Sequence, residues 1–356
     1  LDYSTGAEAF LLEPQRTNLI TYSEDFSDVS WGKVNATITS NYSTSIFGTN
    51  TSFLLTSTSA IAAKINKAIS SSNNTQTYFV KKGNHNFVQI LDFGSVEMYA
   101  NFDLNNGVVG SFGSSSTAYI KELSNGWYKI SCYFTGTTSR TNLYISESNT
   151  SVYGGGNIPI GATIEISAAQ VEQGSYPTSY IPTTTTTVTR NQELCVDATP
   201  VINSEEGVLY AEIAALGLGA SASLGLSDGS GANRVLILLT SGGGVRAFIA
   251  TNSVIVFDET YTSLSTLDNN KIAVSYKLNQ FTLWINGVKR FTDTIGNTPI
   301  GLNQFSFDNG SGASNFFGNT KGLKIYPKAL SDIELETLTS WSSFREMAEA
   351  QSYIVE

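Results

Sequence analysis

Apolar and polar residues alternate along many short segments of the chain. In residues 98–104 every second side chain is apolar. In residues 127–134 the even-numbered side chains are apolar, and the odd-numbered ones form a second face that begins with Trp127 and Lys129. A side-chain period of two is that of a β-strand with one buried face. We therefore expect half-buried strands here, with Cys132 as a buried thiol and not a nucleophile.

Similar segments occur throughout the chain: residues 77–81, 87–93, 142–146, 163–172, 207–213, 234–239, 245–250, 271–278 and 281–285. The last of them ends in Asn286 and Gly287, a pair that favours a tight hairpin turn. One helix is expected, because Ser331 and Glu334 have capping-box spacing and Leu335 continues the apolar pattern. The pattern predicts an all-β fold, two tandem β-sandwich (jelly-roll) domains with a short C-terminal helix.

A polar segment with two prolines separates the two groups of strands. Residues 177–182 begin and end with proline, and five threonines follow at 183–187. Such a segment has little to bury, so it marks a linker. We divide the chain into a connecting segment (1–20), a first sandwich (21–182), a Thr-rich linker (183–200), a second sandwich (201–340) and a C-terminal tail (341–356).

Charged residues are scarce and mostly acidic. They make up 14% of the 356 residues, and 20 basic against 30 acidic side chains give a net charge of −10. This balance opposes binding to nucleic acid and to anionic membrane surfaces. No stretch of 18 or more apolar residues occurs, so we expect no membrane insertion.

Cysteine use and the N-terminal residues add two expectations. Cys132 and Cys195 are the only cysteines, so no disulfide framework holds the fold and each domain needs its own core. The chain begins at Leu1 with neither an initiator Met nor a signal-peptide pattern, and we expect Leu1 to continue from an upstream segment.

Three groups of residues in the first half resemble a module that recurs in tailed-phage virion proteins. They are Leu12–Leu19 with Tyr22–Phe26, then Asn125–Tyr128, then Ala169–Glu172 with Pro177–Thr183. The second half resembles concanavalin A-like, laminin-G-like sandwiches through Leu283–Gly287 and Leu323–Asp332. The resemblance implies a carbohydrate-binding-module-like sandwich followed by a lectin-like one, in a tail fibre, head fibre or head-decoration protein on the virion surface. It supplies no catalytic residues.

No catalytic constellation is visible in the sequence. A glycosidase needs two carboxylates that face one cleft, but Asp92, Glu97 and Asp103 are scattered across a turn. The only histidine, His85, lies in a turn-like segment, which favours a solvated loop residue over a catalytic base. No nucleophile elbow and no phosphate-binding loop occurs. We therefore expect a protein that is not an enzyme; a polysaccharide depolymerase whose acids meet only in the folded chain is an alternative.

Sugar binding needs an exposed aromatic plane with polar groups beside it. The odd-numbered residues of 281–285 are apolar and should face the core, so Trp284 projects from the other face beside Thr282 and Asn286. Trp284 is therefore a candidate sugar platform. The alternative is that a loop or a neighbouring subunit covers this face, and both interpretations are open.

A second, weaker candidate platform lies in the first sandwich. Trp127 shares a strand face with Lys129 and Tyr133, which would supply polar groups beside the ring. A Trp at the start of a strand more often caps the core, and this is the alternative interpretation of Trp127.

Three oxygen-rich loops are candidates for calcium. They contain Asp228, Asp268 and Asp308, each next to Gly, Ser or Asn. Each loop is also an ordinary β-turn, and we favour turns, so no cofactor is expected and Ca²⁺ is kept as an alternative.

These observations leave three hypotheses. The first is a non-enzymatic virion protein that binds host cell-surface carbohydrate in receptor binding or adhesion. The second is a purely structural capsid or tail component, and the third is the depolymerase. The expected partners are a host surface glycan, other virion proteins and further copies of the chain in a homo-oligomer, which in fibres is often a trimer; the purely structural role involves no glycan.

Overall fold

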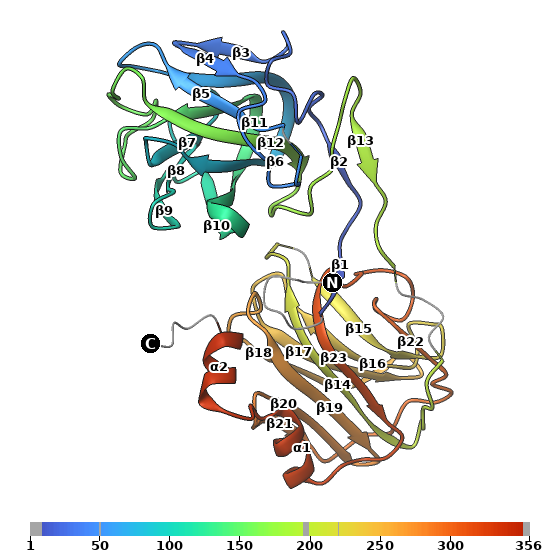
Figure 1. Cartoon of the computed structure of the whole chain (residues 1–356). Coiled ribbons are helices and arrows are strands. Elements are labelled where there is room, and N and C mark those ends of the chain that lie inside the picture. Colours follow the sequence, from blue (N-terminus) through green and yellow to red (C-terminus); the bar gives the residue numbers. More distant parts are fainter. Residues whose placement is uncertain (1–8, 50, 195–198, 220, 352–356) are drawn as a thin grey trace. The chain divides into compact units, whose positions relative to one another are not determined.

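The computed structural model describes residues 9–49, 51–194, 199–219 and 221–351. Within these ranges the chain is a succession of antiparallel strands with two short helices near its end (Figure 1). The predicted all-β class is confirmed. The strands form two compact units, one made of residues 15–191 and the other of residues 1–14 together with 192–356.

The 15–191 unit is built on one ten-stranded sheet. Along its main path the strand order is β4-β5-β12-β6-β11-β7-β8-β9, with β10 and β3 attached to β11 and β6. The strands are β3 (Gly32–Val34), β4 (Ala36–Thr39), β5 (Phe53–Ser57), β6 (Lys64–Lys82), β7 (Phe87–Leu91), β8 (Tyr99–Asp103), β9 (Val108–Phe112), β10 (Ser116–Glu122), β11 (Trp127–Ile145) and β12 (Thr163–Gln173). A separate two-stranded ribbon joins β2 (Arg16–Asn18) to β13 (Val188–Arg190).

The strands β6 and β11 are 19 residues long and turn this sheet into a sandwich (Figure 1). They pair along nearly their whole length, but the register shifts twice, between Phe134 and Thr137 and between Thr138 and Arg140. Bulges of this kind bend a strand pair. One half of the pair adjoins β12 and β10, and the other half adjoins β3 and β7.

Side chains from both halves meet in a single core. The first half contributes Tyr78, Ile130 and Cys132, and the second contributes Ile65 and Leu143, all fully buried. Cys132 is thus the buried thiol that the alternation predicts, and burial raises the pKa of its thiol. Cys195 lies outside the described residues.

The second unit is a sandwich of two separate sheets around one core. Their strand orders are β1-β23-β14-β19-β20-β21 and β18-β17-β16-β15-β22. The strands are β1 (Phe10–Leu12), β14 (Glu206–Ala215), β15 (Ala222–Ser227), β16 (Arg234–Leu239), β17 (Val245–Thr251), β18 (Val254–Tyr261), β19 (Asn270–Lys277), β20 (Gln280–Ile285), β21 (Val288–Asp293), β22 (Gln304–Ser306) and β23 (Gly318–Tyr326).

The helices α1 (Asp332–Thr339) and α2 (Phe344–Ala350) follow the last strand. The predicted capping box is present, since the Ser331 hydroxyl accepts from the Glu334 N–H and the Glu334 carboxylate accepts from the Ser331 N–H. Helix α1 packs by its buried Leu335 against Val208, Ala273 and Trp284 on the outer face of the six-stranded sheet. Neither helix is long enough to cross a membrane.

The division of the chain differs from the one drawn from the linker composition. Strand β1 pairs with β23, and Leu12 is buried in the second core, so residues within the expected connecting segment (1–20) belong to the C-terminal unit. The backbone of Glu13 also exchanges hydrogen bonds with Glu193. The 15–191 unit is therefore inserted between the first strand and the remainder of the second unit. Composition could not show this, because a three-residue edge strand has no distinctive pattern.

We expect Leu12→Ala to destabilise the C-terminal unit by about 2–5 kcal/mol, because Leu12 is almost completely buried in the core and its truncation leaves a cavity there. Calorimetry of the full chain should show one transition moved to lower temperature and the transition of the 15–191 unit unchanged. Leu11→Ala, on the same strand but only partly buried, is the matched control. Equal effects of the two variants would contradict the assignment of β1 to this core.

Candidate functional site

Two of the three sequence groups that resemble the phage module, the first (Leu12–Leu19 with Tyr22–Phe26) and the third (Ala169–Glu172 with Pro177–Thr183), come together in one hydrogen-bonded assembly. Glu172, at the end of β12, is fully buried, and its carboxylate accepts from the backbone N–H of Thr178 (2.8 Å) and from the Thr178 hydroxyl (2.6 Å). The Arg16 guanidinium lies 3.5 Å from the same carboxylate. The motif residues therefore join β2, β12 and the segment after β12.

Asn18 holds the same three segments together at a second point. Its side-chain amide donates to the carbonyl of Ile181 (2.8 Å), and its oxygen accepts from the backbone N–H of Val171 (3.1 Å). Gln170 accepts from the N–H of Ile181 (2.7 Å). All four residues are buried. These hydrogen bonds hold residues 175–181 across the outer face of the half of the sheet that contains β10 and β12. They also connect the first and last segments of the unit to each other.

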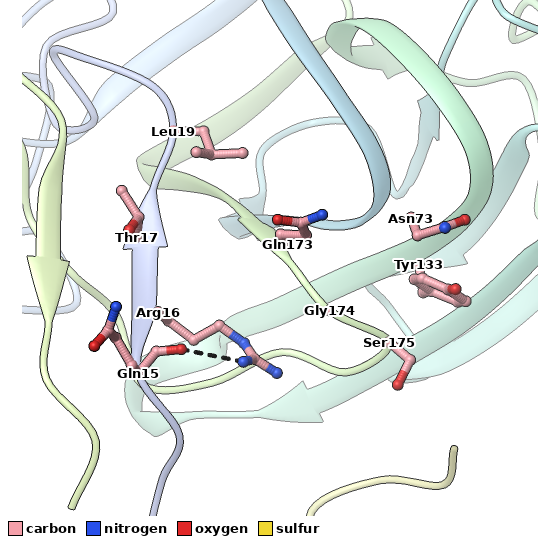
Figure 2. Close-up of a pocket in the computed structure, with 9 residues that line it drawn as sticks. All are labelled: Gln15, Arg16, Thr17, Leu19, Asn73, Tyr133, Gln173, Gly174 and Ser175. Carbon is pink, nitrogen blue, oxygen red and sulfur yellow. Dashed lines mark hydrogen bonds between the residues drawn. The ribbon is translucent and has the colours of Figure 1, made fainter. Parts of the chain in front are cut away.

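A cavity of about 490 Å³ lies beside this assembly (Figure 2). It is lined by β2, by Asn73 in the bend of β6, by Tyr133 of β11 and by Gly174 and its neighbours. Its cation, Arg16, already faces Glu172 and lies over the Tyr176 ring, 5.3 Å from the ring centroid. We assign the cavity to the packing of the assembly, because its one charged group already forms an ion pair with Glu172.

The strand face that carries Trp127, Lys129 and Tyr133, where we predicted a second sugar platform, is the face that residues 175–181 cover. Trp127 is 2% exposed, and the Lys129 ammonium donates to the carbonyl of Thr178 (2.6 Å). Tyr133 is half-buried at the cavity. The proposal of Trp127 as an exposed platform is corrected, since the segment that carries Thr178 covers the strand face on which it lies.

Trp284 does project from the outer face of β20, opposite the core residues Phe281, Leu283 and Ile285. Helix α1 covers it, and only 4% of the side chain is exposed. The face is thus covered, as the alternative to the exposed platform requires, although by a helix and not by a loop or subunit. A buried ring offers no stacking plane, so the platform at Trp284 is corrected.

The two residues expected beside Trp284 do not form an exposed polar surface. Thr282 is 3% exposed. Asn286 sits in the hairpin turn with φ = 50°, accepts from the Lys271 N–H (2.9 Å) and donates to the side chain of Asn270 (2.9 Å). These bonds hold the turn together.

The three aspartates of the candidate calcium loops lie in separate turns. Asp228 accepts from Ser230 and Asn233, and Asp308 accepts from Ser306 and from the N–H of Gly310. Asp268 presents its carbonyl to the Asn270 amide. Across the ranges that the structure describes, no group of three or more His, Cys, Asp or Glu side chains is placed to hold a metal ion.

The arrangement best suited to hold a ligand was not found from the sequence. It lies on the outer face of the other half of the bent sheet, around Lys64 at the start of β6. The Lys64 ammonium donates to the Tyr144 hydroxyl (2.7 Å) and lies 4.2 Å from the centroid of the Phe93 ring and 4.6 Å from that of Tyr144. Phe93 is 48% exposed, whereas Lys64 is 7% exposed. We call Lys64, Phe93, Tyr144 and Arg140 the Lys64 cluster.

Two loops position the aromatic part of the Lys64 cluster. The Asp92 carboxylate accepts from the N–H groups of Gly94, Ser139 and Arg140, which holds Phe93 beside the sheet. The hydroxyl of Tyr153 donates to the Asp92 carbonyl (2.9 Å), and its ring meets that of Phe93 edge-on at 6.5 Å. The Asp92 carboxylate is thus occupied by backbone donors.

Polar groups continue along the same sheet face. The Arg140 guanidinium donates to the Asn66 side chain (2.8 Å). Asn142 lies between Arg140 and Tyr144 on β11 and is fully buried, and its side-chain oxygen accepts no hydrogen bond. Cation, amide and aromatic groups therefore lie along one face within a few strand positions.

The electrostatics of the cluster are unusual for a chain of net charge −10. Burial, and secondarily the positive charge of Arg140, lowers the pKa of Lys64 from 10.5 to about 8. Burial raises the pKa of Tyr144 to about 12. Within the described part of the chain, neither Lys64 nor Arg140 forms an ion pair with a carboxylate. Two cations thus share one face without a counter-charge of their own.

Comparisons with known proteins give a likeness of fold only. No protein-family model and no curated protein matches the sequence. Among solved structures, the carbohydrate-binding module CBM40 of a Ruminococcus gnavus IT-sialidase, bound to alpha2,3 sialyllactose, is 20% identical, with 39% of this chain and 84% of that chain covered and a TM-score of 0.33.

Two further solved structures are similar to a comparable degree. The NanB sialidase of Streptococcus pneumoniae is 18% identical, with 38% of this chain and 24% of that chain covered and a TM-score of 0.34. Domain 4 of AbnA, an arabinanase of Geobacillus stearothermophilus in complex with arabinotriose, is 17% identical, with 42% and 73% covered and a TM-score of 0.33. The β-sandwich assignment rests on the sheets of the chain itself.

We expect Glu172→Ala to destabilise the 15–191 unit by about 3–5 kcal/mol, because it removes the buried acceptor that faces Arg16 and Thr178. Thermal unfolding of the full chain should show this transition lowered. Gln173→Ala, the exposed neighbour, should change it by less than about 0.5 kcal/mol. A Glu172→Ala chain that unfolds like the Gln173→Ala chain would show that the motif residues serve some purpose other than stability.

Proposed function

We propose that this chain is a non-enzymatic carbohydrate-binding protein whose first sandwich binds an acidic sugar at the Lys64 cluster. The observation that carries the proposal is the pair of cations, Lys64 and Arg140, that face no carboxylate and lie beside the exposed Phe93 ring. Burying a lysine lowers the stability of its charged form, so a buried lysine usually has an acid beside it. A carboxylate on the ligand supplies that partner.

The remaining groups of the cluster fit the rest of a sugar. The Phe93 ring offers an apolar plane for the carbon-bound hydrogens of a pyranose. Asn66, which lies beside Arg140 and is 7% exposed, offers a side-chain amide for one of its hydroxyls. Charge-assisted hydrogen bonds to the two cations fix the carboxylate. The chain's overall negative charge opposes an acidic glycan at long range, so specificity rests on this local site.

We further propose that the chain acts on a phage virion, as a tail fibre, head fibre or decoration protein that binds a host surface glycan. The support is the resemblance of the three motif groups, of which the Glu172 and Asn18 contacts join the first to the third. A structural capsid or tail role predicts no glycan binding, and a depolymerase role predicts cleavage. The experiment that tests the sugar site therefore distinguishes both of these roles from glycan binding.

We expect Lys64→Met to weaken binding of acidic oligosaccharides by about tenfold to a hundredfold, because it removes a charged hydrogen bond. The measurement is isothermal titration of the full chain with sialylated, uronic-acid and uncharged oligosaccharides, with assay for new reducing ends. Lys121→Met, an exposed lysine on β10, is the matched control and should bind as the unaltered chain does.

The pH dependence provides an independent check. Lys64 must carry its proton to pair with the ligand carboxylate, and its pKa in the free protein is about 8. Affinity should therefore be constant well below this pKa and fall as the pH rises through it, and Lys64→Met should abolish that dependence. Binding that is insensitive to pH and to Lys64→Met would place the ligand elsewhere, and absence of binding would favour the structural role.

A further inference from the structure

The C-terminal unit has a groove of its own, with a cavity of about 810 Å³. It lies between the outer face of the six-stranded sheet and the segment that includes α1 and residues 340–342. Its floor is formed by Tyr210, Glu212 and Lys324 from the paired strands β14 and β23. Trp341 and Glu336 form part of the opposite wall.

The floor combines an aromatic ring with charged hydrogen-bonding groups. Tyr210 is 4% exposed, and burial together with the nearby Glu212 raises the pKa of its hydroxyl, so it stays protonated. The Lys324 ammonium lies 5.7 Å from the centroid of the Tyr210 ring. Gly322 stands opposite Glu212 across the strand pair, and a Cβ there would meet the Tyr210 ring at 3.5 Å and Glu212 at 3.6 Å. Glycine thus keeps the floor beside these two residues open.

The wall holds the one tryptophan of the four that is not almost completely buried. Trp341 is half-buried, and the Lys271 ammonium lies 4.3 Å from the centroid of its indole ring. Lys271 is itself fixed by the Ser340 carbonyl (3.2 Å) and by the Glu346 carboxylate (2.9 Å). The Lys271 ammonium holds the Trp341 ring in place and occupies one face of that ring.

The charges of the groove decide which ligand class fits. Lys271 is neutralised by Glu346, so Glu212 and Glu336 are opposed by Lys324 alone, which disfavours an anionic ligand. Both aromatic rings already have a lysine of the chain nearby, which disfavours a cationic one. Carboxylates that accept, an ammonium and a phenol that donate, and a flat ring suit the hydroxyls and apolar face of an uncharged sugar.

We propose that this groove binds an uncharged oligosaccharide, with Trp341 as the stacking ring and Glu212, Glu336, Tyr210 and Lys324 as its hydrogen-bonding partners. The site is separate from the Lys64 cluster in residues and in ligand class. Its presence does not depend on acidic-sugar binding by the first sandwich.

The test uses the full chain and its own fluorescence. Trp31, Trp127 and Trp284 are 1%, 2% and 4% exposed, so quenching by acrylamide reports mainly on Trp341. The probes are xylo-, cello-, malto-, manno- and galacto-oligosaccharides, with a sialylated oligosaccharide for comparison. We expect at least one uncharged probe to protect Trp341 from acrylamide in a saturable manner, without release of new reducing ends.

Two identical substitutions separate the groove from the rest of the surface. Gly322→Val places a side chain over the floor and should weaken this binding by about tenfold or more, because it takes space that the sugar needs. Gly242→Val is the matched control, since a Cβ there meets nothing within 4 Å. Glu212→Gln should weaken binding without filling the groove. Melting curves of all variants report whether the fold is kept.

Three outcomes would overturn the proposal: no protection by any uncharged probe, protection by the sialylated probe instead, or binding that Gly322→Val and Glu212→Gln leave unchanged. Release of reducing ends that Glu212→Gln abolishes would overturn a role limited to binding. Lys64→Met provides the distinction from the first site, because it should leave protection of Trp341 intact while weakening acidic-sugar binding.

Discussion

The long antiparallel pair of β6 and β11 determines the architecture of the first sandwich. Because the pair continues through two register shifts, one sheet forms both layers, and every second side chain of each strand faces a common core. The same pairing gives two outer faces that belong to different halves of the same strands. Trp127 and Lys129 lie on one of them, and Lys64 and Tyr144 lie on the other. Any change to this pair would therefore alter the core and both outer faces together.

The two outer faces of that sheet differ in whether a buried charged side chain has a partner of opposite charge within the chain. On the first, the buried carboxylate of Glu172 meets Arg16 and two donors of Thr178, so burial is balanced within the chain. On the second, Lys64 is buried with a tyrosine hydroxyl and two aromatic rings but with no carboxylate. Aromatic faces attract a cation but offset only part of the loss of hydration. This difference is the physical reason why we propose ligand binding at the second face and not at the first.

The C-terminal sandwich shows how a helix can decide the exposure of a sheet. Helix α1 packs Leu335 onto Trp284 and Val208 and so removes part of the outer face from solvent. The part beyond the helix keeps Tyr210 and Glu212 at the floor of a groove, where Gly322 leaves space. A few residues after the last strand thus cover Trp284 and leave Trp341 only half-buried.

The all-β class, the faces of the strands and the capped helix α1 could be predicted from the sequence, because these depend on side-chain periods and local hydrogen bonds. Alternation correctly placed Cys132 and Leu283 in cores and Trp284 on the opposite face. Alternation says which face a residue is on but not what covers that face, so the exposure of Trp127 and Trp284 was decided by residues 175–181 and by α1. The Lys64 cluster also depends on tertiary structure, because Phe93, Arg140 and Tyr144 meet Lys64 only when β6, β7 and β11 pair. The same holds for β1, since a three-residue strand is defined by the partner strand it joins and not by its own pattern.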